Sequence, residues 1–176
     1  MPQIIVYIAA SLDGYIARND GNVDWLSIVN QDGEDYGYHA FYQSVDCLVM
    51  GRKSFEFVQS VAEWPYPGKK SFVLTKRDFE FERDDVEFLS DPVDVVANKI
   101  AAQGFKKIWL MGGGALISAF MRQGLIDDYI ISFIPIMLGE GIPLFPPPGR
   151  EEKLTLVSSK SYPGGLVQVH YKKLPT

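Results

Sequence analysis

The sequence predicts an α/β domain whose central sheet is mixed but mostly parallel, and three observations lead to this prediction. Residues 4–12, 46–50 and 107–111 are nearly continuous apolar runs, which are typical of strands buried on both faces. Segments with helical spacing of apolar residues alternate with these runs along the chain, as in βαβ units. The last two alternating segments, 154–162 and 165–174, are expected to form an antiparallel hairpin.

The elements follow one another in a regular order. Strands are expected at residues 4–12, 46–50, 70–75, 86–89, 107–111, 128–137, 154–162 and 165–174. Helices are expected at residues 34–43, 54–60, 92–103 and 115–123, and residues 24–30 form a loop or a short helix. The helix at 92–103 has Pro92 in its first turn and Gly104 at its end, and the helix at 34–43 is expected to start near Asp32 or Gly33.

Composition indicates a single globular domain over residues 1–176. A chain of 176 residues buries about 70% of its unfolded surface, which is enough for a stable core. Hydrophobic residues make up 47% of the chain and charged residues 22%, a mixture that argues against a disordered chain, a collagen or a coiled coil. The formal net charge of −5 disfavours generic binding to nucleic acid.

Few residues of the sequence could form a disulfide, bind a metal ion or span a membrane. Cys47, the one cysteine of the sequence, cannot form an intrachain disulfide and is interpreted as a core thiol. His39 and His170 are too few and too scattered for a metal motif, so no metal is expected. The start of the chain has no basic segment of a signal peptide, and the longest apolar stretches reach about half a membrane span. The protein is therefore expected to be soluble and cytoplasmic.

The carboxyl ends of three expected strands share a chemical character. Residues 51–54 (Gly-Arg-Lys-Ser) follow the second strand, residues 75–77 (Thr-Lys-Arg) the third, and residues 112–114 (Gly-Gly-Gly) the fifth. Ligands of α/β sheets bind at this edge, where glycines let the backbone approach a phosphate and cations pair with its oxygens. Each segment alone could be a structural turn. Together they predict a phosphorylated cofactor, and Arg52 and Lys76 would suit the extra phosphate of NADPH.

These segments, in this order, resemble those of dihydrofolate reductase and of its relative, the reductase half of the riboflavin-biosynthesis deaminase–reductase. Residues 135–145, which contain Leu-Gly-Glu-Gly and Pro-Leu-Phe, resemble the riboflavin branch more closely. The resemblance implies a dihydrofolate-reductase-like three-layer fold, with helices on both sides of the sheet. The matching segments are residues 8–17 (Ile-Ala-Ala-Ser-Leu-Asp-Gly-Tyr-Ile-Ala), 24–27 (Asp-Trp-Leu-Ser), 49–54 (Val-Met-Gly-Arg-Lys-Ser), 73–76 (Val-Leu-Thr-Lys) and 111–114 (Met-Gly-Gly-Gly).

The resemblance also implies roles around NADPH. Residues 13–21 match a mobile loop that closes over the nicotinamide. The matching cofactor positions are Ala9 and Ile16 beside the nicotinamide, Gly51, Arg52, Lys53 and Ser54 at the adenosine side and pyrophosphate, Thr75 and Lys76 near the 2′-phosphate, and Gly112, Gly113 and Gly114 under the pyrophosphate.

The same resemblance implies a catalytic carboxylate. Dihydrofolate reductase has one on its first helix, and counting back without gaps from Met50 places Asp35 there, with Glu34 beside it. Ser132 falls where the family has a threonine bonded to that carboxylate. A buried carboxylate with a raised pKa could deliver a proton or stabilise charge during hydride transfer. The alternative is that both acids complement the dipole at the start of a helix.

The substrate side departs from both relatives. The chain from Ile28 to Tyr42 contains no Lys or Arg, whereas the riboflavin reductase has basic residues there for a ribose phosphate, and no arginine is placed for the glutamate tail of a folate. The aromatic residues of this region either belong to the core or line the site of a flat heterocycle. The substrate-binding candidates are Trp25, Ser27, Tyr38, His39 and Ser132.

The expected function is an NADPH-dependent oxidoreductase that acts on a small heterocyclic substrate and is similar to the 5-amino-6-(5-phosphoribosylamino)uracil reductase of the riboflavin pathway. Alternatives are a dihydrofolate reductase and a non-catalytic NADP(H)-binding module. The expected partner is a small-molecule substrate, without nucleic acid or membrane. Similarity to the riboflavin relatives, together with the apolar segment 130–138 and the terminal hairpin, also predicts a homodimer.

Overall fold

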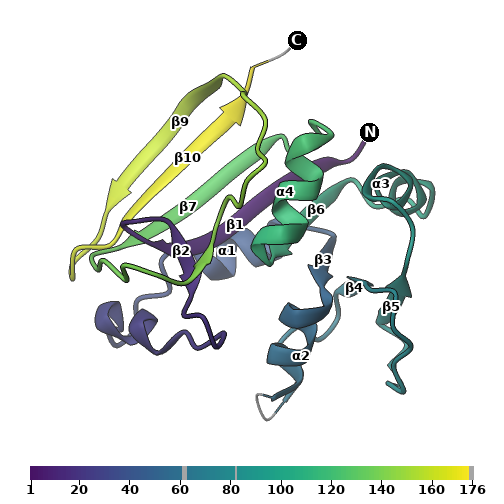
Figure 1. The fold of residues 1–176 in the computed structure, drawn as a ribbon, viewed down its shortest axis with the longest axis horizontal. Coiled ribbons are helices and arrows are strands. Elements are labelled where there is room, and N and C mark those ends of the chain that lie inside the picture. The colour runs from purple at the N-terminus through teal and green to yellow at the C-terminus, as the bar shows by residue number, and fades with distance from the viewer. Residues whose placement is uncertain (61–62, 82, 175–176) are drawn as a thin grey trace.

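The computed structural model describes residues 1–60, 63–81 and 83–174. Figure 1 shows the arrangement of its helices and strands. The strands are β1 (Gln3–Ser11), β2 (Tyr15–Ala17), β3 (Cys47–Gly51), β4 (Lys70–Leu74), β5 (Val86–Leu89), β6 (Lys107–Gly112), β7 (Asp128–Ile134), β8 (Ile142–Pro143), β9 (Leu154–Ser161) and β10 (Val167–Lys173). The helices are the 3₁₀ helix η1 (Asp24–Val29) and the α-helices α1 (Tyr38–Ser44), α2 (Arg52–Ser60), α3 (Val93–Ala102) and α4 (Gly114–Arg122).

One large sheet organises the molecule, with the strand order β5-β4-β3-β6-β1-β7-β10-β9. In this sheet order, the strands β5, β4, β3, β6, β1 and β7 all run parallel to one another. The terminal hairpin extends this sheet, because β10 is antiparallel to β7 and β9 is antiparallel to β10. A second, small sheet pairs β2 with β8. The predicted mixed, mostly parallel sheet with its antiparallel hairpin is therefore confirmed.

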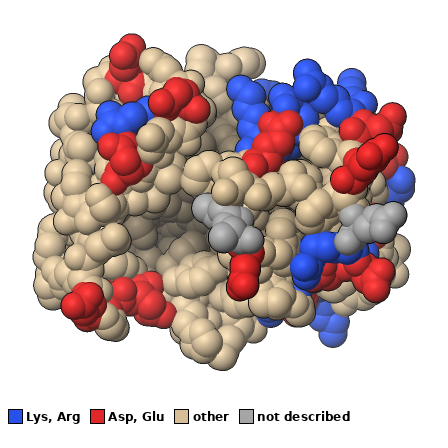
Figure 2. All heavy atoms as spheres, turned by 90° about the horizontal axis from the view of Figure 1, so that it is seen from below, with Lys and Arg blue, Asp and Glu red and all other residues tan. Residues whose placement is uncertain are grey.

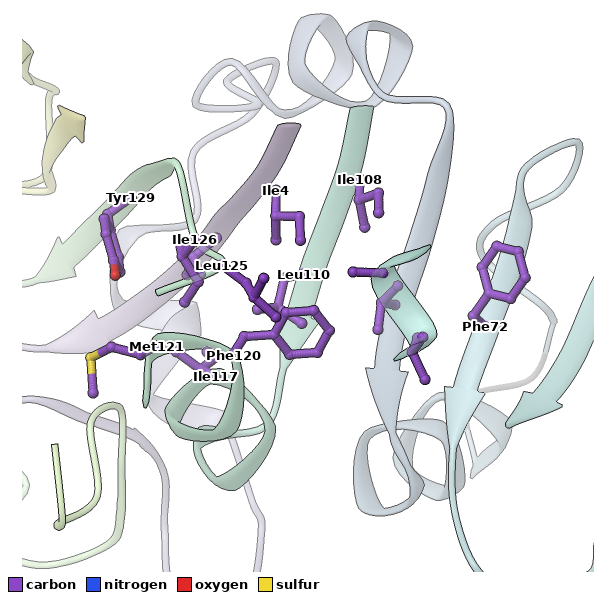
Figure 3. Close-up of a cluster of buried hydrophobic side chains, with 14 of the residues drawn as sticks. Ile4, Phe72, Ile108, Leu110, Ile117, Phe120, Met121, Leu125, Ile126 and Tyr129 are labelled. Atoms are coloured by element: carbon purple, nitrogen blue, oxygen red, sulfur yellow. The ribbon is translucent and has the colours of Figure 1, made fainter. Parts of the chain in front are cut away.

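Helices cover both faces of the sheet, which makes the three layers that the resemblance implies. In the view of Figure 1, α4 lies in front of β1 and β6, and α1 lies behind them. The front layer contains the apolar cluster of Figure 3, in which Ile117 and Phe120 of α4 pack near Ile4 and Leu110 of the sheet. On the other face, Phe41 of α1 and Phe55 of α2 pack with alternate strand residues, including Ile5, Leu48, Met50, Val73 and Trp109.

Helix α1 begins at Tyr38, so the prediction of a helix from residue 34 is wrong by one turn. Asp35 accepts hydrogen bonds from the backbone N–H groups of Gly37 and His39, each at 2.9 Å, and thereby caps the helix. Tyr36 and Gly37 have φ angles of 56° and 81°, which lie in the left-handed region and exclude a continuous right-handed helix. Strand β7 is likewise shorter than predicted and ends before Pro135, which has no N–H for the ladder.

The parallel strands β1, β3, β4 and β6 end along one edge of the sheet, the lower edge in Figure 1. Helix α2 starts at Arg52, directly after β3, and α4 starts at Gly114, two residues after β6. This edge therefore presents two helix N-termini beside each other, one directly after β3 and one separated from β6 by Gly113.

Candidate cofactor and substrate site

The ends of β3 and β6 come together at the glycine turn, residues 112–114. A Cβ atom added to Gly51 would lie 3.7 Å from the carbonyl oxygen of Gly112. A Cβ atom on Gly113 would lie 3.8 Å from Ser54 Oγ and 3.9 Å from Ile16 Cδ1. Five predicted cofactor positions from three segments of the chain thus meet at one point, and the space above Gly113 is bounded by a hydroxyl and an aliphatic side chain.

Each glycine of the turn has its own structural reason. Gly112 has a φ angle of 119°, which L-residues rarely adopt. Gly113 has a φ angle of −74° and is the residue that precedes α4, so its backbone would accept a side chain. Gly114 allows a close approach, because a Cβ atom there would clash with the carbonyl oxygen of Pro143. Within the turn, Gly113 combines an ordinary φ angle with room for a Cβ atom, which would make only van der Waals contacts with Ser54 and Ile16.

A second part of the site lies between the ends of β4 and β5. It is a hollow of about 380 Å³ that contains three cations among its walls. Arg52 also bonds Glu56 through Nη1, at 2.6 and 2.8 Å, and Thr75 Oγ1 accepts the N–H of Arg77 at 3.0 Å. The lining residues are Arg52, Leu74, Thr75, Lys76, Arg77, Leu89, Ser90 and Asp91. The three predicted residues Arg52, Thr75 and Lys76 therefore share one basic hollow.

Sequence reasoning assigned no site role to the end of β5 and included Arg77 only as part of the segment 75–77, although both line this hollow. The signal for the β5 side was available in the parallel strand pattern. Leu74 of β4 pairs with Leu89 of β5, so Ser90 must follow at the same edge as Thr75.

The loop expected to close over the nicotinamide is attached to the segment after β7. Asp13 accepts hydrogen bonds from the N–H groups of Leu138 and Gly139, at 3.1 and 2.7 Å. The Ser11 hydroxyl donates to the same carboxylate at 2.6 Å. This hydroxyl is the main cause of a lowered pKa for Asp13, and the two backbone donors act in the same direction. Farther along the loop, Arg18 pairs with Asp24 at 2.7 Å.

Asp35 is an exposed helix-capping residue in the structure. The N–H groups of His39 and Gly37 lower the pKa of its carboxyl, which is the opposite of the raised pKa expected for an acid catalyst. Its expected partner Ser132 is engaged elsewhere, since Ser132 Oγ accepts a hydrogen bond from Gln168 Nε2 at 3.0 Å. The geometry favours the alternative in which Asp35 serves the start of α1.

The side chains of Tyr7, Ser132 and Gln168 form a cluster of uncharged polar groups, which we call the neutral polar group. Gln168 Nε2 also donates to the carbonyl oxygen of Tyr36 at 3.3 Å, and the Tyr7 hydroxyl donates to that same oxygen at 3.3 Å. Burial raises the pKa of Tyr7 to about 12, so its hydroxyl is protonated at neutral pH. Sequence reasoning missed Tyr7 and Gln168. Tyr7 lies two residues before Ala9 and hence on the same face of β1, and Gln168 pairs with Ser132 across the sheet.

Aromatic rings continue from Tyr7 toward the glycine turn, and we call them the aromatic wall. The ring centroid of Tyr38, at the start of α1, lies 6.4 Å from that of Tyr7 and 5.9 Å from that of Trp109. Tyr66 lies 5.7 Å from Trp109, and its hydroxyl contacts the sulfur of Met111 at 3.6 Å. Met111 directly precedes the glycine turn, so the wall adjoins the predicted cofactor positions. The wall consists of Tyr7, Tyr38, Tyr42, Tyr66 and Trp109.

The other substrate-binding candidates are not part of the aromatic wall, and each one packs in the core or bonds to another residue. Trp25 is 2% exposed and packs with Val29, Ile134, Tyr162 and Leu166, so it is a core residue. Ser27 Oγ donates to the carbonyl of Asp24 at 2.7 Å. His39 is exposed and lies against Gln43, with 2.8 Å between their side-chain nitrogens.

The surface agrees with this division. Figure 2 shows, from below, a hollow whose visible walls are uncharged, and Lys and Arg side chains gathered to its right. Within the described part of the chain, no group of three or more His, Cys, Asp or Glu side chains is arranged to hold a metal ion. None of the helices in those residues is long and apolar enough to span a membrane.

Comparisons with known proteins agree with the fold and the motifs. Residues 68–168 match the RibD C-terminal domain family. The uncharacterized protein YwjB of Bacillus subtilis (strain 168) is 38% identical over 168 residues, which cover 95% of each chain. A crystal structure from Shewanella sp. PV-4, of a protein whose proposed role is riboflavin biosynthesis, is 36% identical with a TM-score of 0.89 and covers 98% of this chain and 99% of that one.

The deaminase/reductase of Thermotoga maritima, named for diaminohydroxyphosphoribosylaminopyrimidine and 5-amino-6-(5-phosphoribosylamino)uracil, shares the fold. Its TM-score is 0.76 at 14% identity, and the match covers 98% of this chain and 57% of that one. With the family match, the strand-end motifs and the sheet topology in agreement, the chain belongs to the RibD C-terminal domain family, as its resemblance to the riboflavin reductases implied.

Proposed function

We propose that the protein is an NADPH-dependent reductase of a small heterocyclic substrate, of the same general kind as the riboflavin-pathway reductases. One observation carries the proposal: three strand ends and two helix N-termini converge on one edge, with a basic hollow at one side and an aromatic wall at the other. This order suits a bound dinucleotide with its phosphates at the hollow and the glycine turn, and a flat substrate at the aromatic wall.

The residues of the site fit NADPH. The backbone at Gly113 and the N-terminus of α4 would accept the pyrophosphate, with Ser54 Oγ as a further donor. Arg52, Thr75 and Lys76 would hold the 2′-phosphate in the basic hollow, where Arg77 adds a third cation. Ala9 and Ile16 would flank the nicotinamide. The cofactor supplies the hydride when it is bound, and the protein binds, orients and shields the reacting groups.

The neutral polar group at Tyr7, Ser132 and Gln168 would meet the polar edge of the substrate. The Tyr7 hydroxyl stays protonated at neutral pH, and by turning its one proton away from the Tyr36 carbonyl it would donate a hydrogen bond to a ring nitrogen or oxygen that gains charge during reduction. Asp35 is ionised at neutral pH, because its pKa is lowered, and holds α1 in place beside this group.

The test of this function is cofactor choice followed by turnover. Calorimetric titration should give tighter binding of NADPH than of NADH, and NADPH absorbance should fall when a pteridine or aminouracil substrate is added. Equal affinity for the two cofactors would contradict the assignment of the basic hollow. Selective NADPH binding without oxidation by any such substrate would instead favour a non-catalytic NADP(H)-binding module.

A homodimer belongs to the same proposal. Strand β9 is the edge of the large sheet, and every one of its residues is exposed, including Leu154, Leu156 and Val157. Exposed apolar side chains on an unpaired edge favour association with a second copy. Light scattering at micromolar concentration should give about twice the mass of the 19.8 kDa chain, and the mass of one chain would contradict this expectation.

A further inference from the structure

The substrate side of the site carries no cation along a long stretch of chain. Between Arg18 and Arg52 the sequence has no Lys or Arg, and this stretch includes η1, α1 and the connection between them. The acidic residues of the same stretch are Asp20, Asp24, Asp32, Glu34, Asp35 and Asp46. The stretch that contributes Tyr38 and Tyr42 to the aromatic wall therefore has six carboxylates and no Lys or Arg.

The strands that support the substrate side of the site carry lysine only at strand ends, at Lys107 where β6 begins and at Lys172 and Lys173 where β10 ends. Neither β1 nor β7 contains Lys or Arg. The polar groups that these strands and β10 bring together are a phenol, a hydroxyl and an amide, from Tyr7, Ser132 and Gln168. All three are neutral at neutral pH, because the pKa of Tyr7 is raised by burial.

The cations at the borders of this region have other partners. Arg18 forms an ion pair with Asp24 at 2.7 Å. Lys69 lies 5.2 Å above the ring centroid of Tyr42, at the end of α1 away from Tyr38, and donates to the carbonyl of Val45. Lys160 lies 4.1 Å above the centroid of the buried Tyr162 ring. Lys53 precedes Ser54, whose hydroxyl faces Gly113, and so belongs to the cofactor side.

A bound phosphate needs the opposite surroundings. Phosphate oxygens in proteins are held by cations or by several N–H groups, and removing such an anion from water without them is costly. The acids of residues 20–46 would add repulsion to that cost. We propose that the substrate carries no phosphate and is an uncharged, flat heterocycle; this inference rests on the proposed reductase function.

The aromatic wall suits such a ring. Tyr38 is 37% exposed and contacts both Tyr7 and Trp109, so one side of the wall is open to a ligand. Aromatic side chains bind flat rings through stacked or edge-on contacts that need no charge. The amide and hydroxyl groups around Ser132 supply hydrogen bonds to the edge of the ring, which fixes its orientation.

Two probes that differ only in the phosphate test this inference. They are 5-amino-6-(5-phosphoribosylamino)uracil and its dephosphorylated ribosylamino form, each titrated into the protein saturated with NADP⁺. We expect the unphosphorylated compound to bind about tenfold more tightly or better, since an unpaired phosphate loses at least one charge-assisted contact. The same order is expected in kcat/KM with NADPH.

Two variants sharpen the result. His39→Lys puts a cation at the exposed start of α1, beside Tyr38, and should improve binding of the phosphorylated probe by about threefold or more without improving the other. Lys160→Ala is the control and should leave the ratio of the two affinities unchanged. If Lys160→Ala no longer bound the phosphorylated probe, this lysine would be a phosphate-binding residue, and the inference would be overturned.

The outcomes separate the inference from the function on which it rests. A protein that fails to bind NADPH contradicts the proposed function. A protein that binds NADPH and prefers the phosphorylated probe, or that binds neither probe, contradicts the substrate class. Preference for the unphosphorylated probe supports both.

Discussion

The basic hollow and the aromatic wall lie at the same edge of the sheet but differ in how they recognise a ligand. The hollow gathers Arg52, Lys76 and Arg77, whereas the wall is built from tyrosines and a tryptophan beside a neutral polar group. Under the proposed function, charge would select the anion that the hollow holds, while shape and hydrogen bonds would select the ring that fits the wall. One fold could then keep its cofactor chemistry while its substrate changes, because the two regions come from different strands.

The largest expected effect comes from filling the space at the junction of the two regions. Gly113→Val should abolish measurable NADPH binding, because the new side chain would occupy the space bounded by Ser54 and Ile16. The φ angle of −74° is compatible with a side chain, so the protein should remain folded. Calorimetry and circular dichroism measure the two results. Ala102→Val, at an exposed position of α3, is the matched control and should bind NADPH normally. Normal NADPH binding by Gly113→Val would refute the assignment of the turn.

The next effect concerns the hollow alone. Lys76→Ala should weaken NADPH binding by about 1.5–3 kcal/mol, the value of a hydrogen bond to a charged group, and should leave NADH binding almost unchanged. Titration of both cofactors into both proteins gives the comparison. An equal loss for NADPH and NADH would mean that Lys76 does not contact the 2′-phosphate.

A smaller effect is expected at the neutral polar group. Tyr7→Phe removes the hydroxyl that donates to the Tyr36 carbonyl but keeps the ring that stacks on Phe41, whose centroid is 4.0 Å away. Loss of one neutral hydrogen bond should cost about 0.5–1.5 kcal/mol in kcat/KM, with NADPH affinity unchanged. Steady-state kinetics measure this value. A matching loss of cofactor affinity would instead place Tyr7 on the cofactor side.

The smallest effect is expected at the acids before α1. Asp35→Asn should change kcat by less than about twofold, because asparagine also caps a helix and the exposed carboxylate is not a proton donor. Glu34→Gln is the matched control. A loss of about 100-fold or more in either variant would restore the carboxylate to the catalytic role that the resemblance implied.

The sequence predicts the cofactor side better than the substrate side, for a physical reason. Residues 51–54, 75–77 and 112–114 directly follow buried strands, so their place at the edge is fixed once the strands are recognised. Tyr7, Ser132 and Gln168 meet only through the register of β1, β7 and β10, which the sequence does not state. The start of α1 was misplaced because a side-chain cap and two left-handed residues replace the expected first turn.

The contact between Gly114 and the Pro143 carbonyl has an evolutionary consequence. Any side chain at residue 114 would displace the segment that contains β8, and this segment is also hydrogen-bonded to the loop after β1, through the Leu144 N–H and the Gly14 carbonyl at 2.8 Å. Exposed positions that make no such contact, such as Ala102 of α3, can vary one at a time. Substitutions in the glycine turn and in residues 138–146 are instead expected to occur together, because these segments are in contact.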